Sequence, residues 1–191
     1  MVEILQADGP EELKEAQRIA RRSFPSPVAP LITRPKWAYL AVVDDRPMAG
    51  IILKSVQGRD GISIGIIEWI FVLPEARGEG LASRLIERGL AAFDERGIEH
   101  MTAWIRDDNT PSWNLFARRG FRFTPFRKAV GPLGFRGFMR SLGGAMFSRG
   151  LDPWMRTPKT PLDHPSDSPE PRSGGFLGNA LLCLSVSAVA V

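Results

Sequence analysis

Residues 66–82 read IIEWIFVLPEARGEGLA, and this stretch decides the fold of the 191-residue chain. An apolar run interrupted only by Glu68 predicts a buried strand, and a glycine-bearing turn follows it. Beyond the turn, apolar residues recur at helical spacing as far as Phe93, and Gly97 stands where this helix should stop. A strand, a glycine turn and a helix in this order point free backbone N–H groups at an anion, because the first helical turn has unpaired donors.

The turn itself leaves two interpretations open. Arg77 adds a cation with a planar fork of donors, which favours a phosphate site. The glycines can equally serve geometry alone, since a single Gly-x-Gly is weak evidence. The turn is not a Walker A loop, because no Gly-Lys-Ser/Thr follows, and Ser83 stands where a dinucleotide fingerprint has its third glycine.

Composition limits the class of protein. The chain is 43% hydrophobic, enough for a core, and its length suits one domain with an extra segment. Cys183 is its only cysteine, which excludes disulfides, cysteine-rich metal sites and a cysteine nucleophile within the domain. The net charge of +4 comes from residues 125–191, so no nucleic-acid partner is expected. No secretory signal is visible at the N-terminus, and we expect a cytoplasmic domain.

Hydrophobic periodicity predicts alternating strands and helices on both sides of the central stretch. A helix should begin around Asp8-Gly9-Pro10, and Asp44-Asp45-Arg46-Pro47 is a hairpin turn signal between two strands. Ser112–Arg119 should form a short helix that stops at Gly120. The expected strands are Val2–Leu5, Trp37–Val43, Met48–Val56, Ile62–Leu73, Ile98–Ile105 and Phe121–Pro125.

The pattern Val72-x-Pro74-x-x-Arg77-Gly78-x-Gly80-Leu81-Ala82 resembles motif A of the GCN5-related N-acetyltransferases. Downstream, the spacing of Asn109, Ser112, Phe116 and Gly120-Phe121 also resembles this family, with Phe116 where the family usually has tyrosine. The resemblance spans about residues 1–130. It implies an α/β (α+β) acyl-CoA N-acyltransferase fold, a mixed and mostly antiparallel sheet flanked by helices.

The resemblance also implies a site for acetyl-CoA as co-substrate, without a metal. Backbone groups of Ile70, Phe71 and Val72 are expected to pair with the pantetheine arm, and the Val72 N–H to bond the thioester oxygen. Asn109 either bonds the coenzyme or caps the following helix, and Phe116 is expected to pack against the arm. The expected pyrophosphate contacts come from Arg77, Gly78, Glu79, Gly80, Leu81 and Ala82, of which Glu79 and Leu81 contribute backbone only.

Glu68 is the candidate general base, because it is the one acid inside an apolar strand. Strand alternation predicts that it shares a face with Ile70 and Val72. The alternative is a structural glutamate bonded to a neighbouring strand or to an arginine. Phe116 cannot supply a proton to the leaving thiolate, and Tyr39, the only tyrosine, lies on a different expected strand.

The segments after residue 130 depart from the family. Residues 131–150 form a basic amphipathic segment, which suits either a membrane surface or a helix packed on the domain. Residues 151–175 are rich in Pro, Ser and Asp and read as a linker. Residues 176–191 carry no charge, and we interpret them as a membrane span cut short, or else as an apolar segment buried on protein.

Two functions follow from these patterns. The first is an acetyl-CoA-dependent N-acetyltransferase in which a primary amine attacks the thioester directly. Its acceptor is a small molecule, a protein N-terminus or a lysine. The second is a weakly catalytic or non-catalytic coenzyme-A-binding regulatory domain, attached to a membrane protein through residues 176–191. The intact motif and Glu68 favour the enzyme, whereas Phe116 and the apolar segment favour the regulatory domain.

Overall fold

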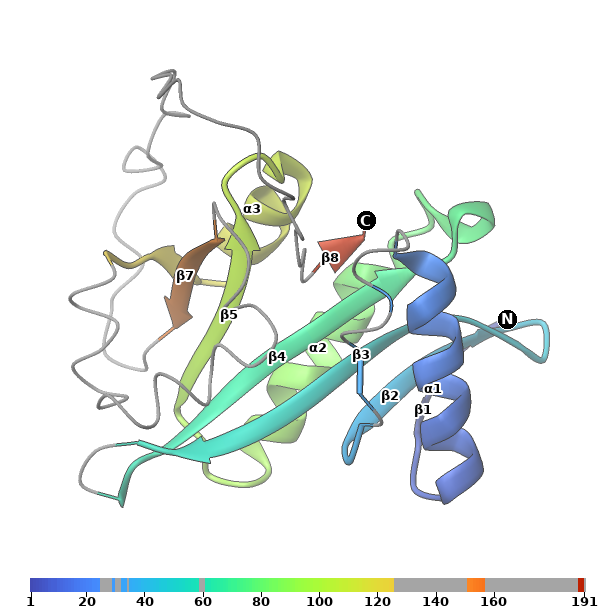
Figure 1. Ribbon diagram of the computed structural model, residues 1–191, viewed down its shortest axis with the longest axis horizontal. Coiled ribbons are helices and arrows are strands. Elements are labelled where there is room, and N and C mark those ends of the chain that lie inside the picture. The colour runs from blue at the N-terminus through green and yellow to red at the C-terminus, as the bar shows by residue number, and fades with distance from the viewer. Residues whose placement is uncertain are drawn as a thin grey trace.

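The computed structural model describes residues 1–24, 29, 32–33, 35–58, 61–125, 151–156 and 189–190. Its helices are α1 (Pro10–Ser23), α2 (Leu81–Asp94) and α3 (Thr110–Ala117). One sheet holds all the described strands, in the order β1-β2-β3-β4-β5-β7-β6, with β8 paired to β4 (Figure 1). The strands are β1 (Val2–Gln6), β2 (Ala38–Val43), β3 (Arg46–Gln57), β4 (Ser63–Val72), β5 (His100–Arg106), β6 (Arg122–Phe123), β7 (Leu151–Arg156) and β8 (Val189–Ala190).

The sheet is mixed and mostly antiparallel, as expected. β1 to β4 form antiparallel neighbours, and β5 and β7 are antiparallel too. β5 joins β4 in parallel, because the chain crosses over through α2. α2, which has 14 residues, is therefore the crossover that carries the chain from the end of β4 back to the start of β5.

Two hydrophobic clusters hold the helices against opposite faces of the sheet (Figure 1). Residues of α2, such as Leu85 and Phe93, pack with Ile67, Ile70 and other residues on one face. Those of α1 pack with Leu40, Ile52, Trp69, Phe71 and others on the other face. Each face buries one helix stripe, so the predicted arrangement of helices on both faces is confirmed.

Local sequence explains the element boundaries. Pro10 occupies the first turn of α1, with Glu11 and Glu12 at its positive end. The predicted hairpin turn is confirmed: Asp44 and Asp45 have positive φ and join Val43 directly to its partner Arg46. Gly50 permits close packing, since a Cβ there would lie 2.5 Å from the Phe71 ring.

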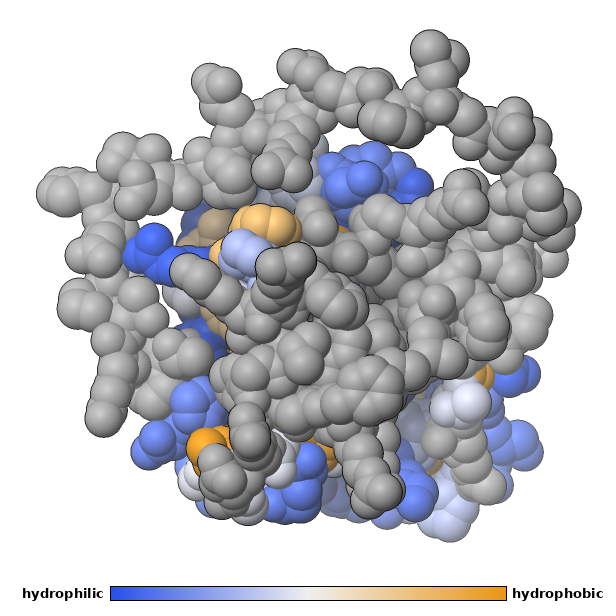
Figure 2. Space-filling model, turned by 60° about the vertical axis from the view of Figure 1, so that its left-hand side comes forward, coloured by the Kyte–Doolittle hydropathy of each residue, from blue (hydrophilic) through white to orange (hydrophobic). Residues whose placement is uncertain are grey.

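The described surface carries few large apolar side chains. The exposed ones are Met1, Leu5, Ile62 and Phe123, which are widely spaced in the sequence. Figure 2 shows one face of the molecule, on which the coloured residues are mostly hydrophilic with isolated apolar residues between them. Scattered apolar side chains of this kind are normal for a folded domain.

The structure corrects one of the expected segment boundaries. The linker expected over residues 151–175 was wrong for its first part, because β7 lies in the sheet between β5 and β6. The ladder between β6 and β7 pairs Arg122 with Met155 and Phe123 with Trp154.

The basic segment 131–150 lies outside the described residues, as does most of the apolar segment 176–191. Within the latter, Val189 and Ala190 form β8 and are not helical. In the parts of the chain that the structure describes, we find no helix with the length and apolar character that a membrane crossing requires.

Candidate active site

α2 begins directly after a turn in which two glycines adopt left-handed backbone angles. The φ angle is +84° at Gly78 and +73° at Gly80, a region that residues with a side chain disfavour. Gly80 is the N-cap of α2, and no side chain caps the helix. A Cβ added at either glycine would meet no atom of the described residues within 4 Å, its chain neighbours aside. The uncapped N–H groups of the first turn therefore border open space, which suits an anion.

The residues predicted to hold a pyrophosphate lie together around this turn. Residues 77–80 are exposed, whereas Leu81 and Ala82 are buried in the core beside α2. The latter two can offer only backbone groups, as expected. Within the described part of the chain, the Arg77 guanidinium forms no ion pair with an acidic side chain. It is therefore free to meet an anion, and the assignment of these residues stays a prediction.

β4 and β5 separate before β4 reaches the glycine turn. Their ladder pairs Ile64 through Ile67 with His100 through Ala103 and then ends. Beyond Ile67, β4 continues to Val72 alongside β3 and no longer pairs with β5, and Figure 1 shows β4 and β5 diverging. The Leu73 N–H donates to Met48 O at 2.9 Å, toward β3. Because successive N–H groups alternate in direction, those of Val72 and Ile70 face the open edge.

This open edge carries a strand in the structure. β8 runs parallel to β4, with Val189 opposite Ile70 and Ala190 opposite Phe71 (Figure 1). The edge can therefore pair with an extended parallel chain. By the same alternation, the backbone groups of Phe71 face β3, and its ring is fully buried beside α1. Of the three residues predicted to pair with a ligand arm, Ile70 and Val72 present their backbone groups there.

Glu68 occupies a bulge in β4. The register shift between Ile52 and Leu53 pairs them with Trp69 and Ile67, which leaves Glu68 without a partner on β3. The extra residue reverses the alternation, so Ile70 and Val72 share the α2 face with Ile67. The expectation that Glu68 shares their face was therefore wrong.

The Glu68 carboxylate meets a cation on the neighbouring strand. Lys54 Nζ donates to Glu68 Oε1 at 2.7 Å, and the side chains are 25% and 28% exposed. Glu68 thus sits in a partly shielded ion pair instead of an apolar pocket. Lys54 is the neighbouring-strand partner that a structural role of Glu68 requires. The role of Glu68 as a base stays a prediction.

α3 carries the two remaining predicted site residues. The Asn109 side chain accepts a hydrogen bond from the Ser112 N–H at 3.2 Å, so Asn109 caps the helix, which was one of its two predicted roles. The Phe116 ring is fully buried and packs edge-to-face on Phe121, with 5.0 Å between centroids. Contact of Phe116 with a pantetheine arm stays a prediction.

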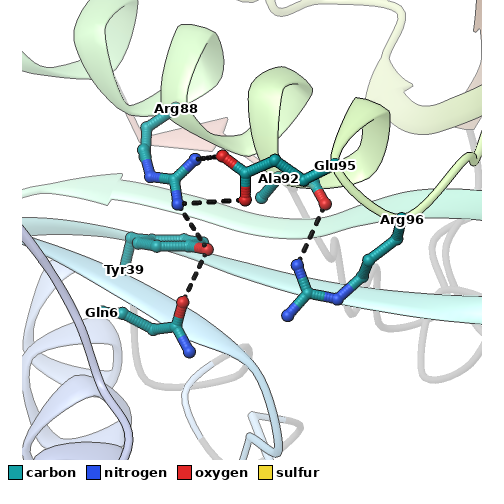
Figure 3. A network of polar contacts seen from close by, with 6 residues as sticks. All are labelled: Gln6, Tyr39, Arg88, Ala92, Glu95 and Arg96. Atoms are coloured by element: carbon teal, nitrogen blue, oxygen red, sulfur yellow. Dashed lines mark hydrogen bonds and ion pairs between the residues drawn. The ribbon is translucent and has the colours of Figure 1, made fainter.

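The Tyr39 side chain belongs to a network of hydrogen bonds between secondary-structure elements (Figure 3). Its hydroxyl donates to Gln6 Oε1 at 2.9 Å and accepts from Arg88 Nη2 at 3.2 Å. Arg88 also lies over the ring and pairs with Glu95, and this hydrogen bond lowers the pKa of the Glu95 carboxyl. Since Tyr39 is 1% exposed, its hydroxyl ties β1, β2 and α2 together and is not available to protonate a leaving group.

Thr102 brings an unpaired hydroxyl to the face that carries Lys54. Thr102 on β5 and Lys54 on β3 both stand opposite Ile66, and residues opposite each other share a face. Thr102 is fully buried, yet its Oγ1 has no hydrogen-bond partner among the residues that the structure describes. A buried hydroxyl without a partner is costly, so this face offers a polar group to a water molecule or a ligand.

We expect Thr102→Val to stabilise the protein by about 1 kcal/mol, because it replaces the unpaired hydroxyl by a methyl group of similar shape. The measurement is the free energy of unfolding in urea. Thr102→Ser, which keeps the hydroxyl and removes the methyl, is the matched variant and should be less stable than wild type. Destabilisation by Thr102→Val would show instead that the hydroxyl is hydrogen-bonded in solution.

An open strand edge that leads into an uncapped helix end suits a ligand with an extended arm and an anionic head. Comparison with known proteins identifies the class. The sequence matches the acetyltransferase (GNAT) family over residues 1–121, more than half of the chain. The chain therefore belongs to this family, and both the expected fold and the expected class of enzyme, an N-acetyltransferase, are confirmed.

Individual relatives agree with this assignment. N-alpha-acetyltransferase 30 of Schizosaccharomyces pombe (strain 972 / ATCC 24843) is 24% identical over 115 residues, which cover 57% of this chain and 77% of that protein. Arabidopsis thaliana Naa50, in complex with the bisubstrate analogue CoA-Ac-MVNAL, has a TM-score of 0.59 at 14% identity, covering 82% of this chain and 98% of the other. The ribosomal-protein-S18-alanine N-acetyltransferase from Escherichia coli has a TM-score of 0.57 at 16% identity, with coverages of 82% and 94%.

Proposed function

We propose that this protein transfers an acetyl group from acetyl-CoA to a primary amine, and that the acceptor is the N-terminal α-amine of a protein or peptide. The observation that carries the proposal is the open edge of β4, which presents Ile70 and Val72 backbone groups and leads into the uncapped end of α2. The relatives include an N-alpha-acetyltransferase and a protein crystallised with a CoA–peptide analogue, which favours a peptide acceptor.

Each part of the donor has a matching part of the site. The pyrophosphate is held by the N–H groups of the turn and the first turn of α2, with Arg77 as a cation. The pantetheine arm pairs with the open edge as an added strand would, and Asn109 and Phe116 line it from α3. The Val72 N–H faces this edge, where it donates to the thioester oxygen as negative charge develops there.

An acceptor that arrives as an ammonium loses two protons in becoming an amide, and the departing thiolate takes up one. Glu68 takes a proton from the acceptor ammonium, directly or through a water molecule, and the neutral amine attacks the thioester carbon. A C–N bond forms, the nitrogen gives up its second proton to water, and the C–S bond breaks, which releases coenzyme A as a thiolate. Since a thiolate is a good leaving group, water suffices to protonate it where Phe116 lacks a hydroxyl.

Calorimetry with acetyl-CoA, followed by assays of thiol release, tests this function. We expect acetyl-CoA to bind, and peptides with a free N-terminus to release thiol faster than the same peptides with a formylated N-terminus. Equal rates for the two peptide sets, or turnover with small amines only, would overturn the peptide acceptor. Binding without turnover on any acceptor would favour the non-catalytic regulatory domain, and absence of binding would overturn both functions.

The pairing of β8 with β4 predicts competition with the donor. The pantetheine arm and β8 cannot both pair with the backbone groups of Ile70, so acetyl-CoA must displace β8 to bind. The double variant Val189→Pro/Ala190→Pro removes both N–H groups of β8. We expect it to bind acetyl-CoA severalfold more tightly, because the free edge becomes more populated.

The matched control for this competition is Val189→Ala/Ala190→Val, which keeps both N–H groups and should bind as wild type does. Calorimetry measures the dissociation constants of all three proteins. An unchanged constant in the proline variant would mean that β8 does not obstruct the donor.

A further inference from the structure

The Lys54–Glu68 pair differs from the other ion pairs of the described residues. Both of its side chains are less than one third exposed, whereas each of the others has at least one side chain more exposed than that. It also joins two neighbouring strands, not two turns of one helix. Exposed pairs contribute little to stability and are easily broken. This shielded pair is therefore the one in which a side chain is held in a fixed place.

Strand register brings the two charges to one face of the sheet. Lys54 stands opposite Ile66, and its neighbour Leu53 stands opposite Ile67 in the core beside α2. Lys54 therefore projects from the other face of the sheet. Glu68 lies two residues beyond Ile66 on β4, so it projects from the same face and reaches Lys54 Nζ. The bulge acts on the residues beyond Glu68: it turns Ile70 and Val72 to the α2 face and leaves the Glu68 carboxylate on the face of Lys54.

The contact with Lys54 involves one of the two carboxylate oxygens of Glu68. Lys54 binds Oε1, and Glu68 Oε2 forms no hydrogen bond or ion pair with the residues that the structure describes. A lysine ammonium is a point donor, so it leaves the second oxygen free, whereas the guanidinium of an arginine commonly binds both. Oε2 can then accept a proton from an amine or from a bridging water molecule.

We propose that Lys54 is a positioning residue for the transfer reaction: it anchors Glu68 by Oε1 so that Oε2 faces the acceptor amine. The inference rests on the proposed function of Glu68 as the base. A glutamate side chain has several rotatable bonds, and fixing it in advance removes an entropic cost from proton transfer. Lys54 itself does not touch the reacting atoms.

A double-mutant cycle tests the inference. Lys54→Met keeps most of the aliphatic stem and removes the ammonium. We expect it to lower kcat about tenfold and to leave KM for acetyl-CoA unchanged, because a displaced base slows only proton transfer. In the Glu68→Gln background the same change should alter kcat less than twofold, since there is no base left to position.

Two controls make the cycle decisive. Glu87→Gln weakens a second ion pair between elements, with Arg119, and should leave kcat within twofold of wild type. Urea unfolding of each variant measures any loss of folded protein. A kcat for Lys54→Met within twofold of wild type would overturn the inference. So would an equal loss in both backgrounds, which indicates a structural effect.

Failure of the proposed function can be distinguished from failure of the inference about Lys54. If wild-type protein transfers no acetyl group to any acceptor, that function is overturned and the role of Lys54 falls with it. If transfer occurs and Glu68→Gln is as active as wild type, Glu68 is not the base and Lys54 has nothing to position. If Glu68→Gln is impaired and Lys54→Met is not, the inference about Lys54 alone is overturned.

Discussion

Gly80→Trp should abolish the binding of acetyl-CoA, with an affinity loss of at least about 100-fold, because two or three charge-assisted hydrogen bonds are worth that much or more. Gly80 is the N-cap of α2, and the space in front of it is open. An indole placed there occupies the volume that a pyrophosphate needs and shields the N–H groups of the first turn. The measurement is calorimetric titration of acetyl-CoA into each protein.

The same helix supplies a matched control. Gly97 follows the end of α2, has a φ of +65°, and a Cβ there would also meet no atom within 4 Å. Gly97→Trp therefore carries a similar backbone strain, roughly 1–2 kcal/mol, at the end of the helix remote from the turn. It should bind acetyl-CoA like wild type. Equal binding losses in both variants would indicate a general effect on folding and would remove the turn as the anion site.

Elements formed by neighbouring residues were predictable from the sequence. Periodicity is a local signal, so the strand, turn and helix around Gly80 follow from residues within a few positions of one another. The same holds for the capping of α3 by Asn109. β7 was missed because its partners on β5 lie far away in the chain. Its own residues, with Pro153 among them, have the local character of a linker.

The surroundings of Glu68 could not be predicted from the sequence, for a different reason. Strand alternation predicts a face only while the ladder is regular, and one bulged residue reverses the prediction for every residue beyond it. The sequence does contain a clue to the ion pair. Lys54 is the only charged residue in the interior of its strand, as Glu68 is in the next strand along the chain. Two lone opposite charges on adjacent strands indicate a contact, which requires a shared face.

Glu68→Gln should lower kcat by about 10² or more, the range for loss of a general base, while the dissociation constant of acetyl-CoA stays unchanged. Glutamine keeps the shape of the side chain and can still accept a hydrogen bond from Lys54 Nζ, but it takes no proton from an amine. The measurement is steady-state thiol release with a saturating peptide acceptor, together with calorimetry for the donor. Glu79→Gln makes the same chemical change in the exposed turn, where only the backbone is expected to act, and should retain full kcat.

The charge of the acceptor separates a base from a structural residue. A peptide amine arrives largely as an ammonium and must lose a proton before it attacks, whereas an aromatic amine is already neutral near pH 7. If Glu68 is the base, Glu68→Gln should impair transfer to the peptide far more than transfer to a neutral amine. If Glu68 only holds β3 and β4 together through Lys54, both acceptors should lose activity to the same degree. Equal losses would therefore assign the carboxylate to the fold and leave water as the base.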